Sequence, residues 1–203
     1  MALKKVLLTG FEPFGGASFN PSGAVVSEIG KLQIVGIEVV TAILPVEFKR
    51  SAQILIELIA EHNPAIVISL GQAEGRDFIG PEQVAINLAD ARIADNAGVK
   101  IENQPINEDD ADGYFSTLPI RQIVSQISAL GISAKVSYSA GAFICNEIFF
   151  TAQSHLKGSQ VISGFIHLPL APEQASQFPG LSTMPISDQV TAITTAIKVC
   201  ANV

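Results

Sequence analysis

The sequence contains few of the features that mark nucleic-acid-binding or membrane proteins. Its 203 residues include 12 Lys and Arg against 19 Asp and Glu, which gives a formal net charge of −7 without any basic cluster. Proteins that bind nucleic acids normally present a basic patch. No segment holds the roughly 18 consecutive apolar residues that predict a membrane-spanning helix. We therefore expect neither a nucleic acid nor a membrane among the partners.

Cysteine, histidine and tryptophan are also scarce, with two, three and no residues respectively. Cys145 and Cys200 lie far apart in the chain. They form neither a CxxC metal-binding motif nor the framework of a disulfide-rich domain. We therefore expect no metal site, and we expect a protein of the reducing cytoplasm.

What the sequence does have is apolar material for a large core. Hydrophobic residues make up 48% of the chain and charged residues only 15%, against about 25% charged residues in typical domains. The length fits one domain, so we expect a single catalytic domain spanning residues 1–203. The low charge also favours contacts between subunits.

Apolar segments of strand length alternate along the chain with segments of helical periodicity. The expected strands are Lys5–Thr9, Ile37–Leu44, Ala65–Leu70, Lys135–Tyr138 and Val161–Ile166. The expected helices are Pro21–Ile29, Glu47–Glu61, Pro119–Leu130, Ile144–Leu156 and Ser187–Ala201. Continuous Val, Ile and Leu runs favour strands that are buried on both faces, as in parallel sheets. The alternation predicts an α/β fold, a three-layer α/β/α domain with a mostly parallel central sheet.

Two long segments, Gly71–Ser116 and Leu170–Ile186, do not follow this alternation. Long loops in a compact domain are usually functional or packed on a partner. In an open α/β sheet, sites form beyond the carboxyl ends of the strands. We therefore expect the loops that follow the strands to share one edge of the molecule and to hold the site.

Cys145 and His167 are the candidate pair for nucleophilic chemistry. Cys145 follows an expected strand and a Ser-Ala-Gly turn, so it falls in the first turn of a helix, where free N–H groups favour a thiolate. His167 follows the apolar run VISGFI at the end of the next strand. A Cys–His pair can activate the thiol. The alternative is an inert, buried cysteine, which is the interpretation favoured for Cys200 in the last helix.

A third group is needed to orient the imidazole, and the loop after Leu70 offers three acids. They are Glu74, Asp77 and Glu82, and spacing alone does not choose among them. Arg76 and Arg92 lie nearby in the sequence and could equally form surface ion pairs.

The loop after the first strand, TGFEPFGGASFNPS, is rich in glycine and phenylalanine. It matches neither a Walker phosphate loop nor GxGxxG, so we expect no nucleotide cofactor. Phe11, Phe14 and Phe19 indicate a pocket for an apolar ring. Anchoring of the loop in the core is the alternative.

Several segments in chain order carry a resemblance to a known family. They are LLTGFEPFGG with NPS, LPV, GQAEGR with PEQVAIN, ARIADN, YSAGAFICN and GFIHLP. Together they resemble pyroglutamyl peptidase type I, also called pyrrolidone carboxyl peptidase. The resemblance implies an α/β/α cysteine exopeptidase without a cofactor. Its expected partners are peptides with an N-terminal pyroglutamyl residue, which it removes through a thioester.

The resemblance also implies roles for individual residues. It places the catalytic triad on Cys145, His167 and Glu82, and it places Arg92 near the oxyanion. The substrate-binding positions that it implies are Phe11, Phe14, Asn20, Gln72 and Phe143. The family often forms tetramers, so a homotetramer is expected. The sequence departs from many members at Glu12, Glu74 and Ala142.

Two alternatives from other classes fit the sequence less well. A nucleoside phosphorylase-like transferase would need basic residues for phosphate, but the first loop has no Lys or Arg between Lys5 and Lys31. An inactive module that only binds pyroglutamyl groups would not need the complete set of Cys145, His167 and Glu82.

Overall fold

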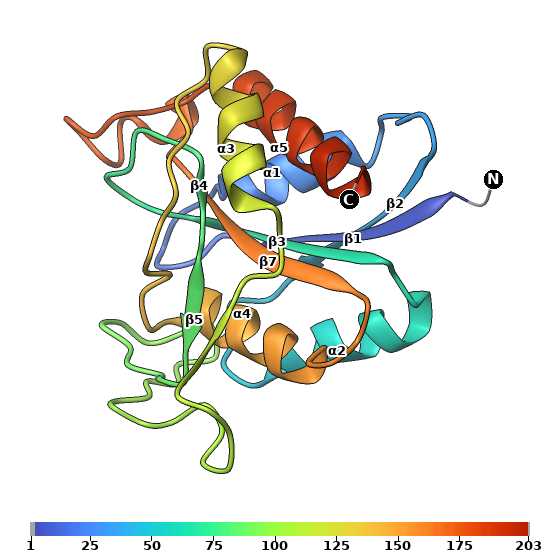
Figure 1. Cartoon of the computed structure of the whole chain (residues 1–203). Helices are drawn as coiled ribbons and strands as arrows, with labels where there is room; N and C mark the ends of the chain where they lie inside the picture. Colours follow the sequence, from blue (N-terminus) through green and yellow to red (C-terminus); the bar gives the residue numbers. More distant parts are fainter. Residues whose placement is uncertain (1–2, 203) are drawn as a thin grey trace.

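The computed structural model describes residues 3–202 and contains a central sheet of five strands in the order β2-β1-β3-β7-β4 (Figure 1). These strands are β2 (Ile37–Leu44), β1 (Lys4–Phe11), β3 (Ile66–Gln72), β7 (Ile162–Leu168) and β4 (Gly80–Pro81). The first four are parallel to one another, and β4 runs antiparallel to β7. A second, two-stranded sheet pairs β5 (Val84–Ile86) with β6 (Gly113–Phe115).

Helices cover both faces of the central sheet (Figure 1). One face carries α1 (Pro21–Ile29), α3 (Ile120–Ala129) and α5 (Ile186–Ala201). The other face carries α2 (Arg50–His62) and α4 (Ile144–His155). A short 3₁₀ helix, η1 (Pro172–Gln174), lies in the segment before α5. The expected three-layer α/β/α fold with a mostly parallel sheet is confirmed.

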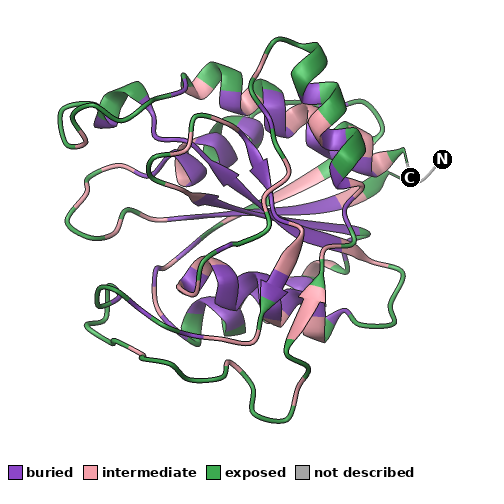
Figure 2. Cartoon of the chain, turned by 60° about the vertical axis from the view of Figure 1, so that its left-hand side comes forward, coloured by how far each residue is buried: buried purple, intermediate pink, exposed green. Residues whose placement is uncertain are grey.

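Alternate side chains of β1, β3 and β7 enter two separate hydrophobic cores, whereas β2 at the edge of the sheet is only partly buried. Val6 and Leu8 of β1 pack against α1, α3 and α5, whereas Leu7 between them packs against α2 and α4. All three are fully buried, and Figure 2 shows the buried strands at the centre of the molecule. This double burial explains why the strands read as continuous apolar runs.

The helix boundaries follow local chemistry that the sequence displays. α1 has the predicted bounds, because the Asn20 side chain accepts a hydrogen bond from the Ser22 N–H at 3.0 Å and Pro21 opens the helix. α2 was expected from residue 47 but begins at Arg50. The N–H groups of Phe48 and Lys49 bind the carboxylates of Asp95 and Glu147 instead, which keeps this turn out of the helix.

The expected strand Lys135–Tyr138 is wrong. Residues 133–137 do lie beside residues 79–83, and their backbones exchange four hydrogen bonds, such as Ile79 N–H to the Ser133 carbonyl. Only isolated bridges result, because Pro81 in the middle of the neighbouring segment has no N–H to donate. The segment Gly71–Ser116, expected to be a long loop, also contains the short strands β4, β5 and β6.

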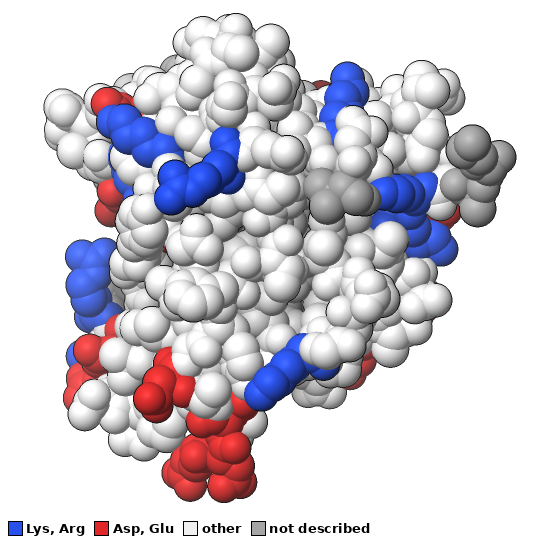
Figure 3. Space-filling model, viewed as in Figure 1, with Lys and Arg blue, Asp and Glu red and all other residues white. Residues whose placement is uncertain are grey.

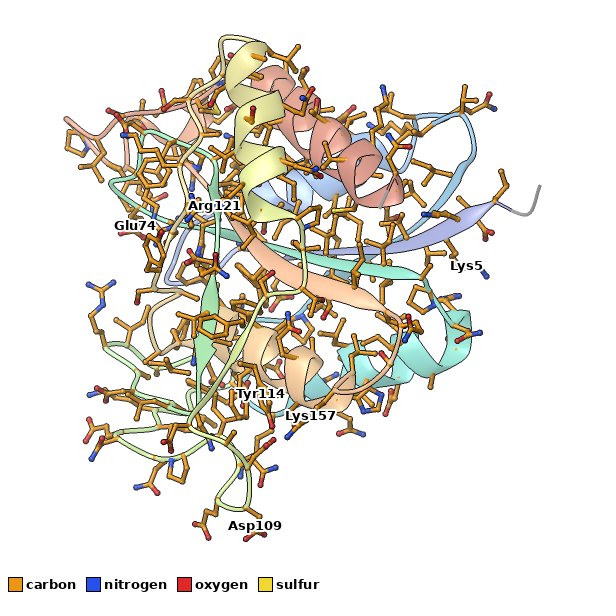
Figure 4. All side chains as sticks on the ribbon, in the orientation of Figure 1. Lys5, Glu74, Asp109, Tyr114, Arg121 and Lys157 are labelled. Carbon is orange, nitrogen blue, oxygen red and sulfur yellow. The ribbon has the colours of Figure 1, made fainter. Side chains whose placement is uncertain are left out.

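No helix among residues 3–202 is long and apolar enough to cross a membrane. On the face shown in Figure 3, a cluster of acidic side chains lies at the lower end, where the loop between β5 and β6 carries Asp109 (Figure 4). This loop is fastened by Asp110, which accepts hydrogen bonds from the hydroxyl groups of Tyr114 and Ser154. The carboxyl ends of the parallel strands lie elsewhere, at the edge of the sheet near β4 (Figure 1).

Candidate active site

The register of the sheet brings three positions to one face at the carboxyl ends of the strands. Leu7 in β1, Val67 in β3 and Phe165 in β7 belong to the core beneath α2 and α4. Two-residue alternation therefore directs Phe11, Gly71 and His167 to this same face. Gly71 and His167 are direct register partners, so the imidazole lies beside a residue with no side chain.

Cys145 reaches this face from the start of α4. It is the second residue of that helix, and Phe143 precedes the helix with an extended backbone. The first turn is closed by the N–H groups of Asn146 and Glu147, which donate to the Phe143 carbonyl. Within residues 3–202, no backbone carbonyl accepts from the N–H groups of Ile144 and Cys145. These two donors therefore stay available beside the thiol.

The close approach of the thiol to the sheet requires glycine at position 71. A Cβ atom placed on Gly71 would lie 2.8 Å from Cys145 Sγ and 2.7 Å from Cζ of Phe165. Real Cβ contacts essentially never occur at such distances. The phenyl ring of Phe165 in turn contacts the imidazole of His167, with ring centroids 4.9 Å apart. The absence of a side chain at Gly71 thus leaves room for the sulfur of Cys145 and the ring of Phe165.

His167 is held by Glu82. The Nδ1 atom of His167 lies 2.7 Å from Oε1 of Glu82, and both side chains are buried. Gly80 of β4 pairs with His167 of β7, so Glu82, two residues after Gly80, points to the same face as the imidazole. The other acids of this loop lie outside the site. Glu74 is exposed (Figure 4), and Asp77 forms an exposed ion pair with Lys135.

Arg76, for which the sequence indicates no role beyond a surface ion pair, is a residue of the site. Its Nη1 donates to Glu82 Oε1 at 2.8 Å, and its Nη2 donates to the Ser139 carbonyl at 3.0 Å. A Cβ on Gly80 would lie 2.8 Å from Nη1, so glycine there leaves room for the guanidinium. The surface ion pair considered for Arg76 is in fact a pair with a fully buried carboxylate. The sequence spacing between Arg76 and Glu82 does not predict this contact, because the contact forms only when the loop folds back on itself.

Burial and neighbouring charges have opposite effects on the pKa of Glu82. Desolvation alone would raise the pKa of Glu82, but the hydrogen bond and charge of His167, with smaller contributions from Ser137 and Arg76, lower it below its ordinary value. Burial, together with the nearby Glu82 charge, raises the pKa of the Cys145 thiol to about 12, although the Arg76 charge opposes the rise. The resting site therefore holds a carboxylate next to the imidazole and a protonated thiol.

A pocket whose lining includes Cys145 lies at the carboxyl ends of β1 and β3. It is lined by all five expected substrate-binding residues and by three more, namely Phe11, Phe14, Asn20, Gln72, Phe143, Val46, Ile144 and Cys145. The ring of Phe143 packs edge-on against Phe48 at 5.3 Å between centroids. No charged residue is among the lining residues. Phe19, the third phenylalanine of the loop, is not part of the lining.

The two amide side chains of the pocket differ in what they leave free. Oδ1 of Asn20 accepts from both the N–H and the hydroxyl of Ser22, and its Nδ2 donates to the Glu12 carbonyl. Asn20 therefore holds the loop as well as lining the pocket. Oε1 of Gln72 accepts from Gln174, whereas Gln72 Nε2 has no hydrogen-bond partner among residues 3–202. Of the two amide side chains, Gln72 is therefore the one whose NH₂ group is available to a ligand in the pocket.

Arg92 is not among the residues that line the pocket with the thiol. Its side chain is exposed and has no hydrogen bond or ion pair within the described part of the chain. Its segment is tied to the turn before α4, because the Asp90 N–H donates to the Ala142 carbonyl at 2.8 Å. The role near the oxyanion stays a prediction. Cys145 and His167, although both lie on the same face, share no hydrogen bond in this structure.

The remaining cysteine and histidines lie away from the site. Cys200 is buried in α5 with Ile193, Ala196 and Ile197, as expected for a packing role. His62 and His155 end α2 and α4, where a helix C-terminus favours a histidine. No group of three or more metal-ligating side chains comes together among residues 3–202.

Comparison with known proteins agrees with this geometry. The family model described as pyroglutamyl peptidase matches residues 4–203. The chain belongs to this family. A pyrrolidone-carboxylate peptidase of Bacillus cereus is 43% identical over 203 residues, covering 99% of this chain and 94% of the relative. One of Vibrio vulnificus is 44% identical over 174 residues, covering 86% of this chain and 82% of the relative.

Solved structures of the family have the same fold. The crystal structure of Bacillus amyloliquefaciens pyroglutamyl peptidase I superposes with a TM-score of 0.94 at 38% identity, covering 98% of both chains. A mutant pyrrolidone carboxyl peptidase from Pyrococcus furiosus gives 0.93 at 38% identity, again with 98% of both chains covered. The resemblance found in the sequence is therefore confirmed, and the protein is a cysteine peptidase of this family.

We expect Gly71→Ala to inactivate the enzyme without unfolding it. The added methyl group would displace the Cys145 sulfur or the Phe165 ring, each less than 3 Å away. A displacement of about 1 Å at the reacting atom can cost about 100-fold in rate. The measurement is kcat/KM together with the melting temperature. Gly30→Ala is the control, because its Cβ would come no closer than 3.2 Å to the Thr41 side chain and 3.5 Å to the Val26 carbonyl oxygen. Unchanged activity of Gly71→Ala would contradict the placement of the thiol.

The turn that carries Val46 into the pocket depends on a buried carboxylate. The N–H of Lys49, a residue with a φ of 62°, donates to both oxygens of Glu147 at 3.0 and 3.1 Å. Burial raises the pKa of Glu147 to about 7, and Asp95 adds to the rise while Lys49 opposes it. The folded state therefore binds the proton of Glu147 more tightly than the unfolded chain does.

We expect Glu147→Gln to stabilise the fold at alkaline pH. A raised folded pKa gives stability that is present below the unfolded value of about 4.5 and lost as pH rises through about 7. Glutamine keeps an acceptor for Lys49 and avoids this loss. Urea unfolding should give a mutant-minus-wild-type difference about 2 kcal/mol larger at pH 8 than at pH 5. The exposed Glu57→Gln serves as control. A difference that does not vary with pH would refute the assignment.

Proposed function

We propose that this chain, as one catalytic domain, hydrolyses the bond between an N-terminal pyroglutamyl residue and the rest of a peptide. The observation that carries the proposal is the position of Cys145. Its thiol lines an uncharged, phenylalanine-rich pocket and lies on the sheet face where Glu82 holds His167. Membership of the pyroglutamyl peptidase family and the names of the relatives support the same activity.

The lining of the pocket suits a neutral lactam. Pyroglutamate has no α-ammonium group, so the site needs no acid to pair with one, and no charged residue lines the pocket. Phe11, Phe14 and Phe143 provide apolar contacts for the ring, and Gln72 Nε2 provides a donor for its carbonyl oxygen. An unmodified N-terminus would bring an unpaired ammonium into this pocket, which is costly.

Acylation is the first half of the proposed reaction. His167 takes the proton of the Cys145 thiol while the sulfur bonds to the pyroglutamyl carbonyl carbon. The free N–H groups of Ile144 and Cys145 stabilise the oxyanion, and one such donor is typically worth about 3 kcal/mol. The tetrahedral intermediate then collapses. The C–N bond breaks, and His167 gives the proton to the departing amine, leaving a thioester.

Hydrolysis of the thioester completes the cycle. His167 takes a proton from water as the water oxygen attacks the thioester carbon. The carbon–sulfur bond then breaks, pyroglutamate leaves, and the proton returns to the Cys145 sulfur. Glu82 keeps Nδ1 of His167 protonated throughout and stabilises the imidazolium that forms twice in each cycle.

The test compares fluorogenic amides that differ only in the N-terminal group. The pyroglutamyl amide should be cleaved, whereas prolyl and glutaminyl amides should react at least about 1,000-fold more slowly by kcat/KM, because the site's donor is left unpaired or an ammonium is buried. Comparable cleavage of the prolyl amide would refute the proposed substrate. A phosphate-dependent transferase is disfavoured because no Lys or Arg lines the pocket.

Quaternary structure and location form a further part of the proposal. We infer a cytoplasmic homotetramer, in line with the two free cysteines and with large apolar side chains that are exposed in the single chain. Val35, Phe115 and Tyr138 are 100%, 72% and 65% exposed. Multi-angle light scattering of the purified protein tests the assembly, and a monomeric mass would refute it.

A further inference from the structure

Gln174 contacts the pocket residue Gln72 from outside the pocket lining. It ends the short helix η1 and is 2% exposed, and it is not among the residues that line the pocket. Its amide bonds to three separate segments, namely its own loop at Ala171, the phenylalanine-rich loop at Phe19, and the end of β3 at Gln72.

Backbone groups decide which way this amide faces. The N–H of Ala171 donates to Oε1 of Gln174 at 3.1 Å, and the carbonyl of Phe19 accepts from Nε2 at 3.3 Å. A backbone N–H can only donate and a backbone carbonyl can only accept. Reversing the Gln174 amide would therefore place donor against donor and acceptor against acceptor. Its orientation is fixed by two independent partners.

The fixed orientation of Gln174 determines the orientation of Gln72. Nε2 of Gln174 lies 2.8 Å from the Gln72 amide and must meet an acceptor, so Oε1 of Gln72 faces Gln174. The Nε2 of Gln72 is then left on the opposite side. This group has no hydrogen-bond partner among residues 3–202, and its residue lines the pocket with Cys145. The Ala171 N–H thus fixes the orientation of the Gln174 amide, and Gln174 in turn fixes the orientation of the Gln72 amide at the pocket.

We propose that Gln174 is a positioning residue that sets substrate specificity by holding Gln72 as a hydrogen-bond donor toward the ring of the substrate. The inference rests on the proposed function. A five-membered ring with a carbonyl accepts from Gln72, whereas a prolyl ring has no acceptor at that place and leaves the donor unpaired. Gln174 touches neither the ring nor the reacting atoms, so its removal should change binding more than chemistry.

The sharpest test replaces the hydrogen-bond donor that Gln174 presents to Gln72 with an acceptor of nearly the same shape. In Gln174→Glu, one carboxylate oxygen still accepts from Ala171, but the other now faces Gln72 with an acceptor. Gln72 must rotate to donate to it and then presents Oε1 to the pocket. We expect KM for the pyroglutamyl amide to rise about tenfold or more, with kcat within about threefold of wild type. Preference over the prolyl amide should fall by a similar factor.

Gln177→Glu is the matched control, since it makes the same chemical change at an exposed position three residues later. It should leave both constants unchanged. Gln174→Met, which removes the polar atoms at similar size, covers the case in which Gln174→Glu does not fold. Without the donor from position 174 the Gln72 amide rotates freely, so Gln174→Met should raise KM about threefold to tenfold with kcat retained.

A double-mutant cycle shows whether Gln174 acts through Gln72. In a Gln72→Ala background, the change at position 174 should have no further effect on KM. An unchanged KM in the folded single variants would overturn the proposal. So would an equal rise in KM with and without Gln72, which would mean that Gln174 only anchors the loop at Phe19. Failure of the proposed function itself would look different, because the wild-type protein would not cleave the pyroglutamyl amide.

Discussion

Cys145→Ala should abolish release of the fluorophore from a pyroglutamyl amide, whereas Cys200→Ala should retain it. Loss of a nucleophile typically costs about 10⁴-fold to 10⁶-fold in kcat. The thiol of Cys145 lies at the start of α4 against Gly71, with the pocket in front of it. Cys200 is enclosed in α5 by apolar side chains on the other face of the sheet. Because the substitution is the same at both cysteines, the comparison distinguishes loss of the nucleophile from loss of a buried packing group.

Alkylation gives an independent measure of the same difference. Iodoacetamide should inactivate the wild-type enzyme and the Cys200→Ala variant, and a pyroglutamyl substrate should slow the reaction at Cys145. Because burial raises the pKa of this thiol to about 12, the rate of alkylation should keep rising with pH well above neutrality. Activity in well-folded Cys145→Ala would contradict the assignment, as would inactivation of the enzyme through Cys200.

Glu82→Gln should lower kcat by about 10³-fold to 10⁴-fold while KM changes little. The carboxylate holds Nδ1 of His167 at 2.7 Å, which fixes the tautomer and balances the imidazolium. A glutamine can present its NH₂ group to Nδ1 and favour the wrong tautomer. It also leaves the guanidinium of Arg76 without its carboxylate partner. KM is unaffected because Glu82 does not line the pocket.

The two other acids of the same loop are the controls for this prediction. Glu74→Gln and Asp77→Asn alter exposed side chains and should leave kcat and KM at wild-type values. Kinetic constants for all three variants, with melting temperatures to confirm folding, complete the comparison. A larger loss of kcat in Glu74→Gln or Asp77→Asn than in Glu82→Gln would assign the orienting acid differently.

Much of the scaffold was predictable because it follows local rules. The bounds of α1 follow from Asn20 and Pro21, and the buried runs in β1, β3 and β7 follow from continuous apolar sequence. The equally apolar run of β2 is only partly buried, because β2 lies at the edge of the sheet. The short strands β4, β5 and β6 have two or three residues each, which is too few to show a period. The segment Lys135–Tyr138 has the composition of a strand. It does not pair as one, because Pro81 in the neighbouring segment has no N–H to donate.

Several individual residues of the site could be predicted from the sequence, but the contacts between them could not. The position of Cys145 in the first turn of a helix and that of His167 at the end of a strand follow from local sequence, although the strand expected before Cys145 is absent. The choice of Glu82 needed either the family resemblance or the antiparallel register of β4 with β7. The contact of Arg76 with Glu82 and the hydrogen bonds of Gln174 join loops that are distant in sequence. No local pattern encodes such pairs, because they arise only when the sheet brings the loops together.

The central claim is that the pyroglutamyl group is transferred to the sulfur of Cys145. Its most direct test is mass spectrometry of the enzyme after rapid mixing with an activated pyroglutamyl ester and acid quench. Acylation of such an ester outpaces hydrolysis, so the enzyme should gain the mass of one pyroglutamyl group. Peptide mapping should place the group on Cys145, and hydroxylamine should remove it. Turnover of the ester with Cys145 unmodified, or an adduct on another residue, would contradict the account.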